Sequence, residues 1–246
     1  MPSSTAWNAL VPDANRLSSQ NCGSRSPANT KPTHIVIHVT GTNSFADVRK
    51  TFMSPNGVSA HYLVGRGGEL YQFVPDRGRA WHAGIEKSVR TLYRKGAATW
   101  QRYLRYFSWF KGYPKDAVYL GGDLNPVWDK TEAVFVAQAS GAPWPHYSYF
   151  TTRWPSLDMP INFDIDPDPN NYSIGIETLG VGATTADPAV YPSAMYSSLR
   201  TLVMDLSKRY KIPMKKGRIV GHEDVNPVAR FGWDPAPGFD WASVYQ

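Results

Sequence analysis

Hydrophobic residues along this chain form short runs separated by turn residues, a pattern that predicts β-strands joined by tight connections. The first run, 33–40, is dense in β-branched side chains, ends at Gly41 and has the length of a central strand. Two later runs flank Gly67 and Gly68, which predicts a hairpin turn. The strands predicted in this way are residues 33–40, 59–64, 69–74, 172–178 and 218–221.

Two further segments have the pattern of amphipathic helices. The pattern of residues 46–53 predicts a short helix between the first strand and the hairpin. A longer helix is expected to follow Ser193 as its N-cap, because apolar residues then recur every three or four positions. Its apolar stripe consists of Met195, Leu199, Leu202, Val203, Leu206 and Tyr210. Strands mixed with helices predict an α/β fold.

Two segments lie outside this pattern. Residues 1–30 are rich in Ser, Asn and Pro, and we interpret them as an arm that lies on the domain or is partly loose. Residues 86–171 are irregular apart from an expected helix near 90–110, and we interpret them as a long loop-rich insertion within a single domain, 31–246.

Composition and charge narrow the class of protein. The chain has 246 residues, 42% of them hydrophobic, which is enough for a sizeable core and excludes disorder throughout. The net charge of +6 is too small to be typical of a nucleic-acid-binding protein, so no nucleic-acid partner is expected. No window approaches the roughly 20 apolar residues of a membrane-spanning helix, and the N-terminus lacks the pattern of a signal peptide. We therefore expect synthesis in the cytoplasm and no integral membrane association.

Candidate catalytic residues fall at the ends of the predicted strands. The single cysteine, Cys22, excludes an internal disulfide and a multi-cysteine zinc site, so any metal must depend on histidines and carboxylates. The residues at strand ends or in the loops after them are His38, Glu177, His222 and Asp234. Two imidazoles, one carboxylate and a position open to water are the ligand set of a catalytic zinc centre. A further carboxylate such as Glu177 can then act as general base and acid.

Several motifs in a fixed order indicate a family. They are residues 35–38, 59–64, 67–72, 81–84, 173–177, 221–227 and 234–241. Together they resemble the zinc-dependent N-acetylmuramoyl-L-alanine amidases of the amidase-2 type, relatives of peptidoglycan recognition proteins and phage lysozyme-amidases. The resemblance covers roughly residues 33–84 and 172–241. It implies a central mixed β-sheet flanked by helices.

The resemblance also implies roles for individual residues. Position by position, it implies Zn²⁺ as the cofactor, His38, His222 and Asp234 as its ligands, and Glu177 as the catalytic acid/base. The implied reaction is hydrolysis of the amide between the lactyl group of N-acetylmuramic acid and the first L-Ala of the stem peptide. The implied partner is peptidoglycan, both glycan strand and stem peptide.

The cation that would stabilise the oxyanion is where this sequence departs from the family pattern. Many members carry a lysine eight residues after the ligand histidine and two before the ligand aspartate. Here Asp234 follows His222 by 12 positions, so the first count reaches Arg230 and the second reaches Gly232. We favour Arg230, a permanent cation that can donate two hydrogen bonds.

The remaining polar residues of these motifs are given structural roles. His61 and His82 are expected to line the groove or to pack, and His34 to be a structural residue. Asp224 is expected to cap the turn after His222 or to orient it, and Glu223 to face solvent.

Three kinds of function remain open. Besides a cell-wall amidase, the sequence permits a peptidoglycan-binding module without catalysis and a zinc hydrolase of another amide. An amidase could be a phage endolysin, a secreted effector or a cytosolic muropeptide-recycling enzyme. The long aromatic insertion, 86–171, and the basic balance favour polymeric wall, reached in the periplasm after delivery by a holin or a secretion system. We expect a monomer, with an immunity or delivery protein as an additional partner in the effector case.

Overall fold

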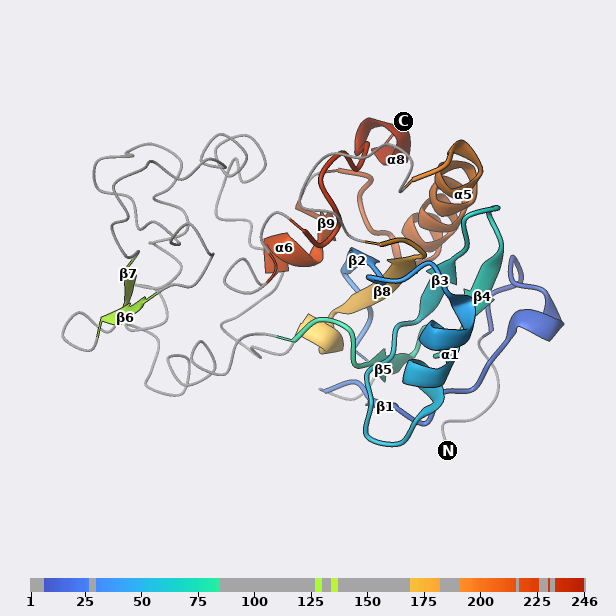
Figure 1. The fold of residues 1–246 in the computed structure, drawn as a ribbon, viewed down its shortest axis with the longest axis horizontal. Helices are drawn as coiled ribbons and strands as arrows, with labels where there is room; N and C mark the ends of the chain where they lie inside the picture. Colours follow the sequence, from blue (N-terminus) through green and yellow to red (C-terminus); the bar gives the residue numbers. More distant parts are fainter. Residues whose placement is uncertain are drawn as a thin grey trace.

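The computed structural model describes residues 7–26, 30–84, 127–129, 134–136, 169–181, 191–215, 217–225, 230 and 233–245. At its centre is a five-stranded sheet in the order β4-β3-β8-β2-β9 (Figure 1). The strands are β2 (His34–Val39), β3 (Tyr62–Val64), β4 (Leu70–Gln72), β8 (Ser173–Thr178) and β9 (Ile219–Gly221). Strand β4 is antiparallel to β3, and the other neighbours are parallel. The α/β fold with a mixed sheet, expected from the sequence, is confirmed.

The two longest strands, β2 and β8, lie side by side within the sheet because their sequences suit burial on both faces. All six residues of β2 are buried, and β8 has one partly exposed residue, Glu177. Burial of successive residues on both faces is typical of central parallel strands. The register pairs His38 with Glu177, and His222 directly follows β9. The carboxyl ends of these parallel strands therefore bring the three residues to one edge of the sheet.

Helix α1 (Phe45–Met53) corresponds to the helix predicted over 46–53 and begins after a side-chain cap. The Ser44 hydroxyl accepts a hydrogen bond from the Asp47 N–H at 3.2 Å. Phe45 stacks on Tyr71 of β4 with ring centroids 4.2 Å apart. Because Tyr71 pairs with Leu63, and Leu63 with Glu177, helix α1 covers part of the sheet face that bears Glu177.

Helix α5 (Ser193–Tyr210) carries the predicted apolar stripe, but its start differs from the prediction. Ser193 is the first helical residue and Pro192 is the N-cap, without a side-chain capping bond. The fixed φ of proline suits this extended position immediately before the helix. The buried apolar residues of the helix are Met195, Leu199, Leu202, Val203 and Leu206.

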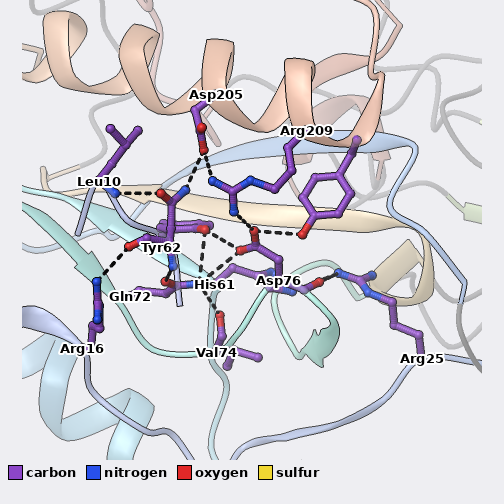
Figure 2. A network of polar contacts seen from close by, with 12 residues as sticks. Leu10, Arg16, Arg25, His61, Tyr62, Gln72, Val74, Asp76, Asp205 and Arg209 are labelled. Atoms are coloured by element: carbon purple, nitrogen blue, oxygen red, sulfur yellow. Dashed lines mark hydrogen bonds and ion pairs between the residues drawn. The ribbon is translucent and has the colours of Figure 1, made fainter. Parts of the chain in front are cut away.

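A buried carboxylate connects α5 to the sheet. Asp76 accepts hydrogen bonds from the Tyr62 hydroxyl, from Gln72 at 3.1 Å, from Arg209 at 2.8 Å and from the Tyr210 hydroxyl at 3.0 Å (Figure 2). Burial raises the pKa of Asp76 above its usual value, although these donors favour the charged form. Tyr62 lies on the sheet face opposite to Glu177, and Arg209 and Tyr210 belong to α5, so α5 covers that opposite face.

The N-terminal segment packs on the domain over residues 7–26. Its strand β1 (Cys22–Ser24) pairs antiparallel with β5 (Gly78–Ala80), a small sheet that the sequence did not predict. The buried Arg25 guanidinium donates to the backbone carbonyls of Asn170 and Asp76, both at 2.9 Å. Asn8 donates to Asp205 of α5 at 2.9 Å. These contacts join the segment to β5, to the residues just before β8 and to α5.

The other described elements are short. They are the 3-10 helices η1 (Asp13–Asn15) and η2 (Pro169–Asn171), the hairpin of β6 (Val127–Asp129) and β7 (Val134–Val136), and the helices α6 (His222–Val225) and α8 (Ala242–Tyr245). The helix expected near residues 90–110 lies outside the described residues, as does most of the expected insertion, 86–171. Within the described ranges, no helix is long and apolar enough to cross a lipid bilayer.

His34 at the start of β2 makes folding stability depend on pH. Its ring is buried between the Thr33 hydroxyl at 2.7 Å and the Arg218 guanidinium at 3.1 Å. Burial, with the Arg218 charge adding to it, lowers the pKa of His34 to about 3. The unfolded chain takes up this proton near pH 6.5, so stability is present above that pH and is lost as the pH falls toward 3.

We expect His34→Gln to flatten the acid side of the stability profile. The slope of unfolding free energy against pH should decrease by about 1.4 kcal/mol per pH unit between about pH 6 and 4, which is one proton. Urea titrations of both proteins at several pH values measure this difference. Equal slopes would show that His34 is not held neutral in the fold.

Candidate metal centre and acid–base site

The three residues expected as metal ligands meet at the carboxyl edge of the sheet. The Oδ2 atom of Asp234 lies 2.9 Å from Nδ1 of His222 and 3.5 Å from Nδ1 of His38. One potential ligand atom from each residue lies within 4.8 Å of the others, and all three side chains are buried. The set combines the end of β2, the start of α6 and the loop before α8.

Two backbone hydrogen bonds hold Asp234 in this position. Its Oδ1 atom accepts from the Val39 N–H at 3.0 Å, and its carbonyl accepts from the Glu223 N–H at 2.8 Å. The loop is thereby tied to β2 and α6 at once, which leaves Oδ2 facing the two imidazoles. Glu223, expected to face solvent, is only 4% exposed because α6 packs against this loop, so that prediction was wrong. The Asp224 side chain lies outside the described part of the chain.

The donor set fits a zinc ion. In a tetrahedral site with Zn–N and Zn–O bonds near 2.0–2.1 Å, ligand atoms lie about 3.3 Å apart. The two measured separations, 3.5 and 2.9 Å, lie on either side of that value. Two imidazoles and one carboxylate leave a fourth position, the arrangement of catalytic rather than structural zinc sites.

Electrostatics favour the metal-binding protonation states of Asp234 and His222. Burial opposes charge on Asp234, but His38 and His222 outweigh it and hold the pKa of Asp234 well below its usual range. Burial lowers the pKa of His222 to about 4. Burial also opposes charge on His38, but Asp234 and Glu177 raise its pKa. An ionised Asp234 beside a neutral His222 supplies ligands that bind without losing a proton.

Glu177 lies beside this set with one carboxylate oxygen uncommitted. It projects from β8 on the same face as His38, and its buried Oε2 has no hydrogen-bond partner among the described residues. Burial raises the pKa of Glu177 to about 7, with Asp234 adding to the rise and His38 and Arg230 opposing it. A carboxyl group with a pKa near 7 can accept and return a proton at neutral pH.

Arg230 supplies a cation to the same site. Its positive charge opposes the rise in the pKa of Glu177 and of His38, and it adds to the fall in the pKa of His222. The guanidinium carbon lies 4.5 Å from the centre of the Trp233 ring, a cation–π contact that restricts its position. The alternative position in the sequence count, Gly232, lies outside the described residues.

The family assignment follows from comparison with known proteins. A family model described as N-acetylmuramoyl-L-alanine amidase matches residues 28–237. The chain belongs to this family. The match includes His38, Glu177, His222, Arg230 and Asp234, and it confirms the resemblance seen in the motifs.

Curated relatives of this amidase-family chain carry one name, 1,6-anhydro-N-acetylmuramyl-L-alanine amidase AmpD. The Enterobacter cloacae protein is 37% identical over 76 residues, which is 31% of this chain and 36% of the relative. The Citrobacter freundii protein is 24% identical over 185 residues, or 75% of this chain and 54% of the relative. The chain therefore spans about a third and about half of the length of these two relatives.

A solved structure supports the fold of the amidase-family chain. A crystal structure of a Se-Met AmpD derivative superimposes with a TM-score of 0.53 and 23% identity. The alignment covers 97% of this chain and 94% of that one.

His61 and His82, which were expected to line the groove or to pack, are both buried but have different partners. His61 is fully buried, accepts a hydrogen bond from the Gly175 N–H at 3.0 Å and contacts Arg25 at 3.1 Å, so it is a structural residue. His82 instead contacts the candidate ligand His38, with 3.0 Å between Nδ1 of His82 and Nε2 of His38. His82 belongs to the motif at 81–84, but spacing alone could not reveal its contact with His38.

Proposed function

We propose that this chain is a zinc-dependent N-acetylmuramoyl-L-alanine amidase that hydrolyses the amide between N-acetylmuramic acid and the L-alanine of peptidoglycan. The observation that carries the proposal is the buried His38–His222–Asp234 set beside Glu177, whose free Oε2 is buried at the same strand edge. Family membership supports the substrate class. A binding module would need neither a complete ligand set nor this carboxyl group.

Each residue has a distinct role in the proposed reaction. His38, His222 and Asp234 would hold zinc, which would supply a Lewis acid and lower the pKa of the attacking water. Glu177 accepts the proton of the attacking water and returns it to the nitrogen of L-Ala as the amide bond breaks. The Arg230 guanidinium donates hydrogen bonds to the negative charge that develops on the lactyl carbonyl oxygen.

Metal removal tests the proposed cofactor. Dialysis against a zinc chelator is expected to reduce hydrolysis of a muramyl peptide to the background rate, and stoichiometric zinc is expected to restore it. The reason is that zinc would lower the pKa of the attacking water and so supply the nucleophile at neutral pH. Release of peptide with a free L-Ala amine, followed by mass spectrometry, measures both steps. His34→Gln serves as a control that should respond in the same way as the wild type. Full activity in protein shown to be free of metal would contradict the proposal.

Arg230→Ala tests the oxyanion cation. Loss of one preorganised donor to the oxyanion costs about 10²–10³-fold in kcat with little change in KM. Arg230→Lys is expected to recover part of this loss, since it restores the charge without the planar pair of donors. Unchanged kcat in Arg230→Ala would assign oxyanion stabilisation to another group.

The physiological substrate is proposed to be polymeric wall, with the protein acting in the periplasm as an endolysin or effector after holin- or secretion-mediated delivery. The basic charge and the aromatic content favour this substrate. The names of the curated relatives specify a 1,6-anhydro-N-acetylmuramyl substrate and favour a muropeptide-recycling enzyme as the second candidate. Values of kcat/KM on intact sacculi and on a soluble anhydromuropeptide separate the two.

A further inference from the structure

Behind His38, on the side away from Asp234, runs a chain of buried hydrogen bonds. Nε2 of His38 lies 3.0 Å from Nδ1 of His82, and Nε2 of His82 lies 3.2 Å from the Ser173 hydroxyl. That hydroxyl donates to the carbonyl of Pro169 at 2.8 Å. His38, His82 and Ser173 are all less than 10% exposed, so water does not compete for these bonds.

The chain of bonds allows one placement of protons. A carbonyl only accepts, so the single proton of the Ser173 hydroxyl is directed to Pro169, and the Ser173 oxygen accepts from Nε2–H of His82. A neutral His82 then has no proton on Nδ1, which must accept from Nε2–H of His38. The lone pair of neutral His38 is therefore on Nδ1, the atom that faces Oδ2 of Asp234.

The sheet is shaped to hold the His82 ring in place. The backbone N–H of His82 donates to the Asn170 side-chain oxygen at 3.0 Å, and the imidazole ring lies over Gly175 of β8. A Cβ atom at position 175 would lie 2.3 Å from the ring, well inside contact distance. A glycine within a central strand normally weakens it, and here it provides room for the imidazole beside His38.

We propose that His82 is a positioning residue that, through Ser173 and Pro169, fixes His38 in the tautomer and ring orientation required for a zinc ligand. The inference rests on the proposed zinc site and extends it to groups that do not touch the metal. Loss of a partner that hydrogen-bonds the second nitrogen of a ligand histidine typically weakens metal binding 10–100-fold.

Zinc affinity of the full chain, measured by competition with a chromophoric chelator, tests this role. His82→Leu removes the acceptor and is expected to weaken zinc binding about 10–100-fold. His82→Asn places an amide oxygen near the position of Nδ1 and is expected to recover most of the affinity. If His82 had a merely structural role, both variants would lose thermal stability, and His82→Asn would not bind zinc more tightly than His82→Leu.

Two further measurements keep the test decisive. Ser173→Ala removes the acceptor of His82 without altering either ring, and it decides the matter if His82→Leu does not fold. Long-range ¹H–¹⁵N spectra of the imidazoles are expected to place the His38 proton on Nε2 in the wild type and to show a tautomer mixture in Ser173→Ala. His34→Gln, which changes another buried histidine of β2, is expected to leave zinc affinity unchanged.

The outcomes separate this inference from the proposed function. If the wild type binds no zinc, the proposed metal site itself is wrong. If the wild type binds zinc and both His82→Leu and Ser173→Ala bind it equally well, or if the His38 proton resides on Nδ1, the site stands and the positioning role is overturned.

Discussion

Glu177→Gln is expected to lower kcat about 10²–10⁴-fold while zinc affinity stays close to that of the wild type. Glutamine has nearly the shape of glutamate but cannot accept the proton of the attacking water or return it to the leaving amine. The buried position of Glu177 beside His38, outside the His38–His222–Asp234 set, is the reason to expect this separation of catalysis from metal binding. Steady-state kinetics on a muramyl peptide, together with zinc titration of the same preparation, measure both quantities.

Asp234→Asn provides the contrast for Glu177→Gln. It removes the negative charge from the ligand set and is expected to weaken zinc binding and to lose activity together, with added zinc restoring part of the activity. If Glu177→Gln retained wild-type kcat with zinc bound, the general acid/base role would have to belong to another group.

Among the substitutions proposed for this protein, Asp76→Ala is expected to lower the free energy of unfolding most, by about 2–4 kcal/mol. The substitution leaves Tyr62 and Gln72 buried without their acceptor, and it removes the ion pair with Arg209. We do not expect the largest losses of stability that follow from breaking a fully buried ion pair. The Arg209 side chain is a third exposed, so water can hydrate it once Asp76 is removed. Urea denaturation at pH 7 measures the change.

Asp13→Ala is the matched control for Asp76→Ala. Asp13 pairs with Arg16 at the surface and its side chain is 88% exposed, so no measurable loss is expected. A similar change in both variants would show that the network in Figure 2 contributes no more than a surface pair. Zinc affinity of Asp76→Ala, measured while the protein is still folded, should equal that of the wild type, since Asp76 lies on the sheet face opposite to Glu177.

The elements that the sequence predicted are those with strong local patterns. The run that became β2 is dense in β-branched side chains, every second residue of β8 is β-branched, and the stripe of α5 has a clear helical period, so local sequence determined these elements. Candidate site residues were recognisable because parallel strands bring their carboxyl ends to one edge, and the structure places the candidate ligands His38 and His222 there together with Glu177.

The features that sequence did not predict depend on contacts between distant segments. Strand β1 has three residues and exists because it pairs with β5, more than fifty positions later. Glu223 is buried by the loop of Asp234, and His82 meets His38 only after β8 has placed Gly175 beneath its ring. Hydrophobic periodicity contains no signal for these tertiary contacts.

Digestion in ¹⁸O-labelled water tests the central claim most directly. Sacculi and a soluble anhydromuropeptide are each incubated with the zinc-loaded protein, and the products are identified by mass spectrometry. We predict unlabelled stem peptides that begin with a free L-Ala amine, and one ¹⁸O atom in the lactyl carboxylate of the muramic acid. Both substrates left intact, or ¹⁸O found at a peptide carboxyl terminus or on a sugar carbon, would contradict the assignment of this chain as an N-acetylmuramoyl-L-alanine amidase.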